Sequence, residues 1–214
     1  MNTIVILGQH VEVPFATDTS RLGQLATRPR LDPHAVCQVI LHHDACLSAR
    51  ACFDALHGRG LSTHFCIDND GTVRQFEDPG ARIAFHAVGH VRGSDPDRPQ
   101  AQVAFNRASI GIDLSNAVDV KFAHRYDPPR DQATLPVQGR PYTGLLPYPC
   151  QVEAALELLQ VLRMHFPALT NDHREELRWL GDLTPATPGI WAHGQVSRVK
   201  VDPFGFPFSR LDEV

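Results

Sequence analysis

Short apolar runs separated by turn residues make up most of the chain, and each run predicts one element of secondary structure. Residues 36–42, which read Val-Cys-Gln-Val-Ile-Leu-His, predict a buried strand, and residues 3–7 predict a shorter one. Ser48 is placed to cap a helix that ends at Gly58, because serine is a preferred N-cap and glycine commonly follows a helix end. The next strand is expected over residues 62–67.

Turn signals and prolines organise the middle of the chain. The Asp-Asn-Asp-Gly sequence at 68–71 predicts a hairpin whose return strand covers residues 72–76. Apolar residues alternate over 108–114 and predict another strand. Residues 116–149 carry six prolines and no periodicity, which indicates a long loop, and long ordered loops are often functional.

Helical spacing dominates the last third of the chain. Apolar residues recur every three or four positions over 152–166 and predict an amphipathic helix. Asp172 and Glu175 form a capping-box pattern, which predicts a short helix that continues through Leu180. Residues 189–193 predict the last strand.

The interleaved strands and helices predict an α/β fold with a central mixed β-sheet flanked by helices. The length of 214 residues, with 43% hydrophobic and 21% charged residues, fits a single domain over residues 1–214, in which residues 1–35 form an N-terminal extension. Fifteen glycines and seventeen prolines exclude a helical bundle or a coiled coil. The net charge of -4 provides no basic patch, so we expect no nucleic-acid partner.

The first residues lack the basic region and the long apolar stretch of a secretory signal, and no window approaches the length of a membrane span. We therefore expect a protein that is cytoplasmic at synthesis and is not inserted in a membrane. Five cysteines without a Cys-x-x-Cys pair exclude a disulfide scaffold and a cysteine-rich zinc module. Cys46 and Cys52 are close enough in sequence to pair locally, and the sequence leaves open whether they do.

Histidines gather at the ends of predicted strands and in the adjoining turns, where polar side chains point into a shared cleft. They are His42, His43, His64, His86, His90 and His193. His42 and His193 each end a strand, and Asp202 follows nine residues after His193. Two imidazoles and one carboxylate leave zinc an open fourth position, which is typical of catalytic sites. Spacing alone does not single out this set, since its members lie far apart in the chain.

Five sequence blocks, in this order, resemble the zinc-dependent N-acetylmuramoyl-L-alanine amidases, the group that is shared with the peptidoglycan-recognition proteins. The blocks are VILHHD at 39–44, LSTHFCIDNDGTV at 61–73, AFHA at 84–87, NRASIGIDL at 106–114, and AH at 192–193 with KVDP at 200–203. Each block is short, but their number and their order make the resemblance specific. It implies the mixed-sheet fold of that group.

The resemblance also implies a role for each matched residue. His42, His193 and Asp202 match the three ligands of one zinc ion, and Lys200 matches a lysine that assists catalysis. Asp113 falls where many bacterial relatives carry a catalytic Glu. Because the Asp side chain is one methylene shorter, this position departs from the family pattern.

Four further residues are expected on the substrate side of the site. Thr63 falls where other relatives carry a catalytic Tyr, His86 matches a histidine that lines the substrate groove, and a polar residue near Asn106 orders a loop in the family. His43 follows the first ligand, at a position where relatives tolerate other residues. The segment 116–149 is expected to wall the groove.

The resemblance implies a zinc amidase that hydrolyses the bond between N-acetylmuramic acid and the L-alanine of the peptidoglycan stem peptide, with peptidoglycan or a muropeptide as its partner. Two alternatives stay open, namely a peptidoglycan-binding module of the same fold and a zinc amidase that acts on a different amide. The filled ligand positions and Lys200 favour the enzyme. The setting also stays open between recycling of imported muropeptides in the cytoplasm, bacteriolytic action on the cell wall by an endolysin-like protein after release, and a secreted toxin.

Overall fold

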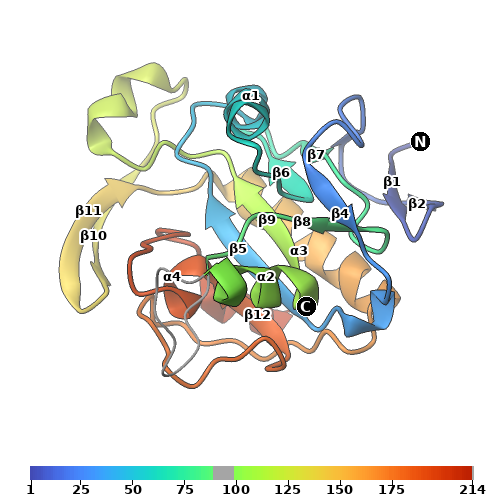
Figure 1. Cartoon of the computed structure of the whole chain (residues 1–214). Coiled ribbons are helices and arrows are strands. Elements are labelled where there is room, and N and C mark those ends of the chain that lie inside the picture. Colours follow the sequence, from blue (N-terminus) through green and yellow to red (C-terminus); the bar gives the residue numbers. More distant parts are fainter. Residues whose placement is uncertain (89–98, 214) are drawn as a thin grey trace.

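The apolar run around residue 40 forms β5, the second strand of a six-stranded mixed sheet (Figure 1). The computed structural model describes residues 1–88 and 99–213. In spatial order the strands are β12 (Gly189–Ala192), β5 (Gln38–His43), β9 (Ser109–Leu114), β6 (Phe65–Ile67), β7 (Val73–Gln75) and β3 (Thr17–Asp18). The first four run parallel to one another, whereas β7 is antiparallel to β6.

Helices cover both faces of this sheet (Figure 1). They are α1 (Ala49–Arg59), α2 (Pro99–Ala108) and α3 (Pro149–His165). The apolar side of α3 packs with Val39 and Leu41 of β5 in one core cluster, while Ile40 packs on the opposite face in a cluster that includes Phe105 of α2. Because successive side chains of a strand point to opposite faces, His42 lies on the same face as Ile40, away from α3.

The expected α/β fold, a mixed sheet flanked by helices, is confirmed. The turn at 68–71 joins β6 to β7, with Gly71 at a φ of 83°. Ser48 caps α1 as expected, since its hydroxyl accepts a backbone hydrogen bond from the first turn. The helix, however, continues past Gly58 and ends at Arg59, and the residue after it, Gly60, adopts the left-handed conformation at a φ of 63°.

The segment 116–149 is not the long loop expected from its prolines. Its elements are a 3-10 helix (Val120–Arg125) and a hairpin of β10 (Gln132–Val137) and β11 (Arg140–Leu145). Gln138 and Gly139 form the two-residue turn, with φ values of 51° and 75° that suit a tight hairpin. The strands tolerate Pro136 and Pro141 because a two-stranded hairpin leaves one edge of each strand without a partner.

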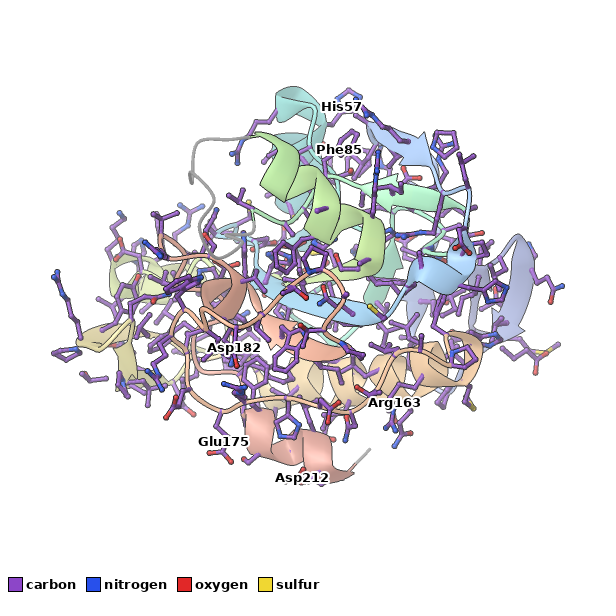
Figure 2. The ribbon with its side chains drawn as sticks, turned by 60° about the horizontal axis from the view of Figure 1, so that its bottom comes forward. His57, Phe85, Arg163, Glu175, Asp182 and Asp212 are labelled. Atoms are coloured by element: carbon purple, nitrogen blue, oxygen red, sulfur yellow. The ribbon has the colours of Figure 1, made fainter. Side chains whose placement is uncertain are left out.

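The short helix expected to continue through Leu180 is not formed, and the segment around Glu175 runs irregularly (Figure 2). Other parts of the fold take up its backbone groups. Ile190 N donates to Asp172 O, and Leu180 N donates to Gln195 O, both at 2.8 Å. These tertiary hydrogen bonds to the last strand and to the turn after it override the local capping pattern.

Residues 1–35, expected as an extension, pack closely on the rest of the domain. Besides β3 of the central sheet, their strands are β1 (Thr3–Ile6), which pairs with β2 (Gln9–Glu12), and β4 (Thr27–Pro29), which pairs with β8 (Arg82–Ala84). Ile4 and Ile6 belong to the core cluster beneath α3. The remaining short helices are α4 (His193–Val196) and two 3-10 helices (Pro33–Ala35 and Phe208–Glu213). Among the described residues, no helix has the length and apolar character needed to cross a membrane.

His64 is a fully buried histidine that ties the central sheet to its surroundings. Its Nδ1 accepts from Gly111 N at 2.9 Å, and its Nε2 donates to Arg82 O at 3.2 Å. Burial, assisted by the charge of Arg30, lowers the pKa of His64 to about 3. The ring is therefore neutral at pH 7 in the folded chain.

This buried neutral ring predicts a loss of stability on acidification. The folded pKa lies below the unfolded value of 6.5, so the contribution of His64 is complete above pH 6.5 and is lost as the pH falls toward 3. Between pH 7 and pH 5, the free energy of unfolding of the chelator-treated protein should fall by about 2 kcal/mol more than that of His64→Gln, whose amide does not titrate. Urea unfolding at the two pH values measures this difference, and equal losses in both proteins would contradict it.

Candidate metal centre

Three neighbouring strands end side by side, and the register of their pairing brings polar side chains together. β5 pairs with β9 so that His42 lies opposite Asp113. β12 pairs with β5 so that Ala192 lies opposite Leu41, which places the next residue, His193, beside His42. The carboxyl ends of parallel strands meet at one edge of a sheet, which is where ligands bind in open α/β folds.

Side-chain atoms of His42, His193 and Asp202 converge on one point. Nδ1 of His42 lies 3.0 Å from Nδ1 of His193 and 3.1 Å from Oδ2 of Asp202, and Nδ1 of His193 lies 3.0 Å from the same oxygen. All three residues are buried. Ligands bound tetrahedrally at about 2.0–2.1 Å from zinc stand about 3.4 Å apart, so small movements of these atoms would fit the ion. The three residues therefore form a candidate metal centre.

Asp202 lies on the loop that follows α4, and two hydrogen bonds hold this loop near the strand ends. Gly194 N donates to Asp202 O at 2.8 Å, and Phe204 N donates to Nδ1 of His43 at 3.2 Å. Burial lowers the pKa of His43 to about 4, so its ring is neutral and can accept this bond. His43, which was expected on the substrate side, also supports the segment that carries Asp202.

Gln138, in the turn between β10 and β11, also hydrogen-bonds to the loop that carries Asp202. Its Nε2 donates to the backbone oxygens of Gly194 and Lys200, both at 2.8 Å, and its Oε1 accepts from Trp179 N at 2.9 Å. Sequence reasoning does not identify Gln138, because the local Gln-Gly signal marks a turn and says nothing of these distant contacts.

The two carboxyl groups near the centre differ in their electrostatics. Burial would raise the pKa of Asp202, but the adjacent His193 and His42 hold it well below its usual value, so Asp202 is ionised. Burial raises the pKa of Asp113 to about 6, and His42 opposes this only in part. A carboxyl group with such a pKa is suited to accepting and releasing a proton near neutral pH.

Thr63 and Asn106 make their polar contacts within the protein. Thr63 is fully buried, and its hydroxyl donates to Phe65 O at 3.4 Å. Oδ1 of Asn106 accepts from His86 N at 3.2 Å and from Ala87 N at 2.8 Å. The Asn106 side chain therefore holds the backbone of His86 and Ala87, and Thr63 bonds to the backbone of β6.

The outer ring nitrogens of both histidines contact the segment that Asn106 orders. Nε2 of His42 lies 3.0 Å from Nδ1 of His86, and Val88 N donates to Nε2 of His193 at 3.1 Å. Because Nε2 of His193 accepts, the proton of the neutral ring lies on Nδ1, which faces Asp202. A neutral imidazole that binds a metal ion at Nδ1 carries its proton on Nε2, so metal binding at His193 requires this proton to move to Nε2 and the contact with Val88 N to change.

A cavity of about 630 Å³ opens over the candidate centre. The expected site residues that line it are His42, His43, His86, Asn106, Asp113, His193, Lys200 and Asp202. Thr63 does not contribute to the lining, and neither does any described residue of 116–149, so the expectation that this segment walls the groove is wrong. The walls come instead from α1 and from residues 59–62 and 199–201. His90 lies outside the described residues.

The cysteines near the cavity are free thiols, so Cys46 and Cys52 are not paired. Asp44, Cys52 and Cys66 form a second group of close potential ligands. The carboxylate of Asp44, however, accepts from Cys46 N at 2.8 Å and from Asn116 N at 3.0 Å. Asp44 therefore ties together the two loops that follow β5 and β9.

The sequence and the fold were compared with those of known proteins. A family model described as N-acetylmuramoyl-L-alanine amidase matches residues 32–205. That range contains all three residues of the candidate centre, as well as Asp113 and Lys200. No curated protein sequence gives a significant match.

Solved structures share the fold at low sequence identity. A selenomethionine derivative of AmpD is 16% identical, with 93% of each chain covered and a TM-score of 0.53. AmiD from E. coli, solved with the substrate anhydro-N-acetylmuramic acid-L-Ala-D-γ-Glu-L-Lys, is 18% identical, with 99% of this chain and 65% of that chain covered and a TM-score of 0.53. AmpDh3 from Pseudomonas aeruginosa, solved with an anhydromuramic pentapeptide, is 19% identical, with 100% and 66% covered and a TM-score of 0.51. The chain thus spans about two thirds of the last two proteins.

The geometry predicts which histidines are needed for metal binding. We expect one zinc ion per chain, and we expect His42→Ala and His193→Ala to retain less than about a tenth of it, because even loss of a ligand's hydrogen-bond partner weakens binding 10–100-fold. His43→Ala is the matched control and should retain clearly more zinc than either ligand variant, since it removes no ligand atom and only one hydrogen bond of the loop that carries Asp202. The zinc content of each purified variant, measured at the same free zinc concentration, tests this prediction. Loss of zinc from His43→Ala but not from His42→Ala would assign the ligand to the neighbouring position.

Proposed function

The chain belongs to the N-acetylmuramoyl-L-alanine amidase family, and on this basis we propose that it is a zinc-dependent amidase. The proposed reaction is hydrolysis of the amide bond between N-acetylmuramic acid and the L-alanine of the peptidoglycan stem peptide. The observation that carries the proposal is the convergence of two imidazole nitrogens and one carboxylate oxygen, 3.0–3.1 Å apart, in the lining of a cavity. We propose that residues 1–214 act as one catalytic domain.

The proposed substrate class follows from the relatives. AmiD and AmpDh3 were solved with peptides joined to anhydromuramic acid. The cavity of about 630 Å³ is large enough for part of such a molecule, since small-molecule sites commonly measure about 300–1,000 Å³. The substrate is a soluble muropeptide or a peptidoglycan strand, which corresponds to a role in recycling or in lysis.

The proposed mechanism divides the work between zinc and the side chains of the cavity. Zinc, when bound, acts as a Lewis acid on the amide carbonyl and lowers the pKa of water. Asp113 accepts the proton of the attacking water and delivers it to the leaving amine nitrogen, a role worth about 10²–10⁴-fold in rate. Lys200, in the cavity lining, supplies a positive charge that stabilises the oxyanion developing on the carbonyl oxygen.

A binding module of the same fold is the competing function. A module that only binds peptidoglycan needs neither a complete set of metal ligands nor a proton acceptor beside them. Here all three ligand positions are filled, and Asp113 lies next to His42 across the paired strands. These residues support the enzyme over the binding module.

Asp113→Asn is expected to remove turnover while zinc stays bound. The amide cannot accept a proton, so kcat/KM should fall by about 10²–10⁴-fold. Asp113→Glu is the matched variant, since it keeps the carboxylate and should keep activity. In the wild-type protein kcat/KM should fall as the pH decreases and Asp113 becomes protonated, because the protonated carboxyl cannot accept the proton; burial raises the pKa of Asp113 in the metal-free chain, and the charge of a bound zinc ion would lower it. An active Asp113→Asn protein would show that another group is the proton acceptor.

Mass spectrometry of the products tests the reaction itself. Purified peptidoglycan and a soluble muropeptide are each incubated with the protein, with and without a zinc chelator. We expect free stem peptides that begin at L-alanine, and only in the absence of the chelator. A preference for one substrate distinguishes lysis from recycling. Intact substrates in the presence of a zinc-loaded protein would favour the binding module or a different amide.

A further inference from the structure

A chain of hydrogen bonds leads from His42 away from the candidate metal centre into the protein interior. Nε2 of His42 lies 3.0 Å from Nδ1 of His86. Nε2 of His86 lies 3.2 Å from Oγ of Ser109, and Ser109 Oγ donates to Phe105 O at 2.7 Å. The four residues come from β5, from the segment after β8, from β9 and from α2, so the hydrogen bonds link four separate parts of the fold.

Phe105 O, the last partner in this row of hydrogen bonds, determines which atom donates in each of them. A backbone carbonyl can only accept, so the hydroxyl proton of Ser109 is committed to Phe105 O. Oγ of Ser109 must then accept from Nε2–H of His86. A neutral His86 ring with its proton on Nε2 has a bare Nδ1, which accepts from Nε2–H of His42. The neutral ring of His42 consequently presents a bare Nδ1, the atom that faces His193 and Asp202.

The ring of His86 is held in this position by two further contacts. A Cβ atom at position 111 would lie 2.5 Å from Cγ of His86, so the ring packs directly on the backbone of β9 where only glycine leaves room. The backbone nitrogen of His86 donates to Oδ1 of Asn106 at 3.2 Å. The ring is thus fixed by its face, by its backbone and by both of its nitrogens.

We propose that His86 is a positioning residue for the metal centre, which accepts the Nε2 proton of His42 and so keeps Nδ1 of His42 unprotonated and aimed at the metal position. The proposal rests on the zinc centre proposed above. Histidine ligands in metal sites generally donate their second nitrogen to a fixed acceptor, and loss of that acceptor weakens metal binding about 10–100-fold. Here the acceptor is itself a histidine, and its own direction is set by Ser109 and Phe105.

The test compares zinc affinity between two replacements of His86. His86→Leu removes the acceptor and should weaken zinc binding about 10–100-fold in competition with a chromophoric chelator. His86→Asn keeps an oxygen close to the place of Nδ1 and should restore most of this affinity. His64→Gln is the matched control, because His64 is a buried histidine near His86 that does not bond to His42, and it should bind zinc as the wild type does.

Equal zinc affinity in His86→Leu and the wild type would overturn the proposal. So would an equal loss in His86→Asn and His86→Leu, because the ring's packing would then matter and its acceptor atom would not. A wild-type protein that binds zinc without hydrolysing muropeptides would refute the proposed activity and leave the positioning role standing. A wild-type protein that binds no zinc would overturn both.

Ser109→Ala provides a variant that should fold even if His86→Leu does not, because it removes a single buried oxygen. Loss of the acceptor for His86 should weaken zinc binding by about two- to tenfold, the equivalent of one hydrogen bond. Long-range nitrogen NMR of the zinc-free wild type should show the proton of His42 on Nε2, and Ser109→Ala should shift protons toward Nδ1. An unchanged tautomer together with unchanged zinc affinity would refute the directional chain.

Discussion

The in-register pairing of β5 with β9 on one side and with β12 on the other determines where the candidate catalytic groups lie. His42 lies opposite Asp113, and His193 follows the residue that pairs with Leu41. The register is fixed by the apolar core beneath α3, which takes Val39 and Leu41 from β5. A slip of one residue would turn these side chains to the other face and bury His42 among the apolar groups of α3. The site therefore depends on packing that lies on the opposite side of the sheet.

Local patterns predicted the elements whose signals are local. The apolar run of β5, the helical spacing of α3 and the turn at 68–71 each depend on neighbours in sequence, and each is formed. The helix expected at 172–180 failed because tertiary hydrogen bonds took its backbone groups. The prolines of 116–149 obscured a hairpin, and nothing in the pattern indicated α2. The metal centre could not come from spacing, since its two histidines lie 151 positions apart; the family resemblance brought them together.

Around the three candidate ligands, polar atoms form hydrogen bonds with residues from several elements. Val88 and His86 take up the outer nitrogens of the two histidines, Asn106 holds the segment between them, and Gln138 holds the loop that carries Asp202. In a buried setting each unsatisfied group would cost about 1–3 kcal/mol, so such a network favours one arrangement over its alternatives. The same burial leaves Asp113 with a raised pKa beside an ionised Asp202. Two carboxyl groups in one cavity are thereby suited to different tasks.

His42 and Asp202 lie 160 positions apart in sequence, and this separation affects how stable the folded protein is and how fast it is degraded. An unfolded chain does not hold these atoms together, so a cation bound by them binds the folded state alone. By mass action such a cation stabilises the fold by about 2.7 kcal/mol when its free concentration is 100 times its dissociation constant. The fraction of molecules open to proteases would then follow the local supply of the metal, and scarcity of the ion would shorten the protein's lifetime as well as remove its activity.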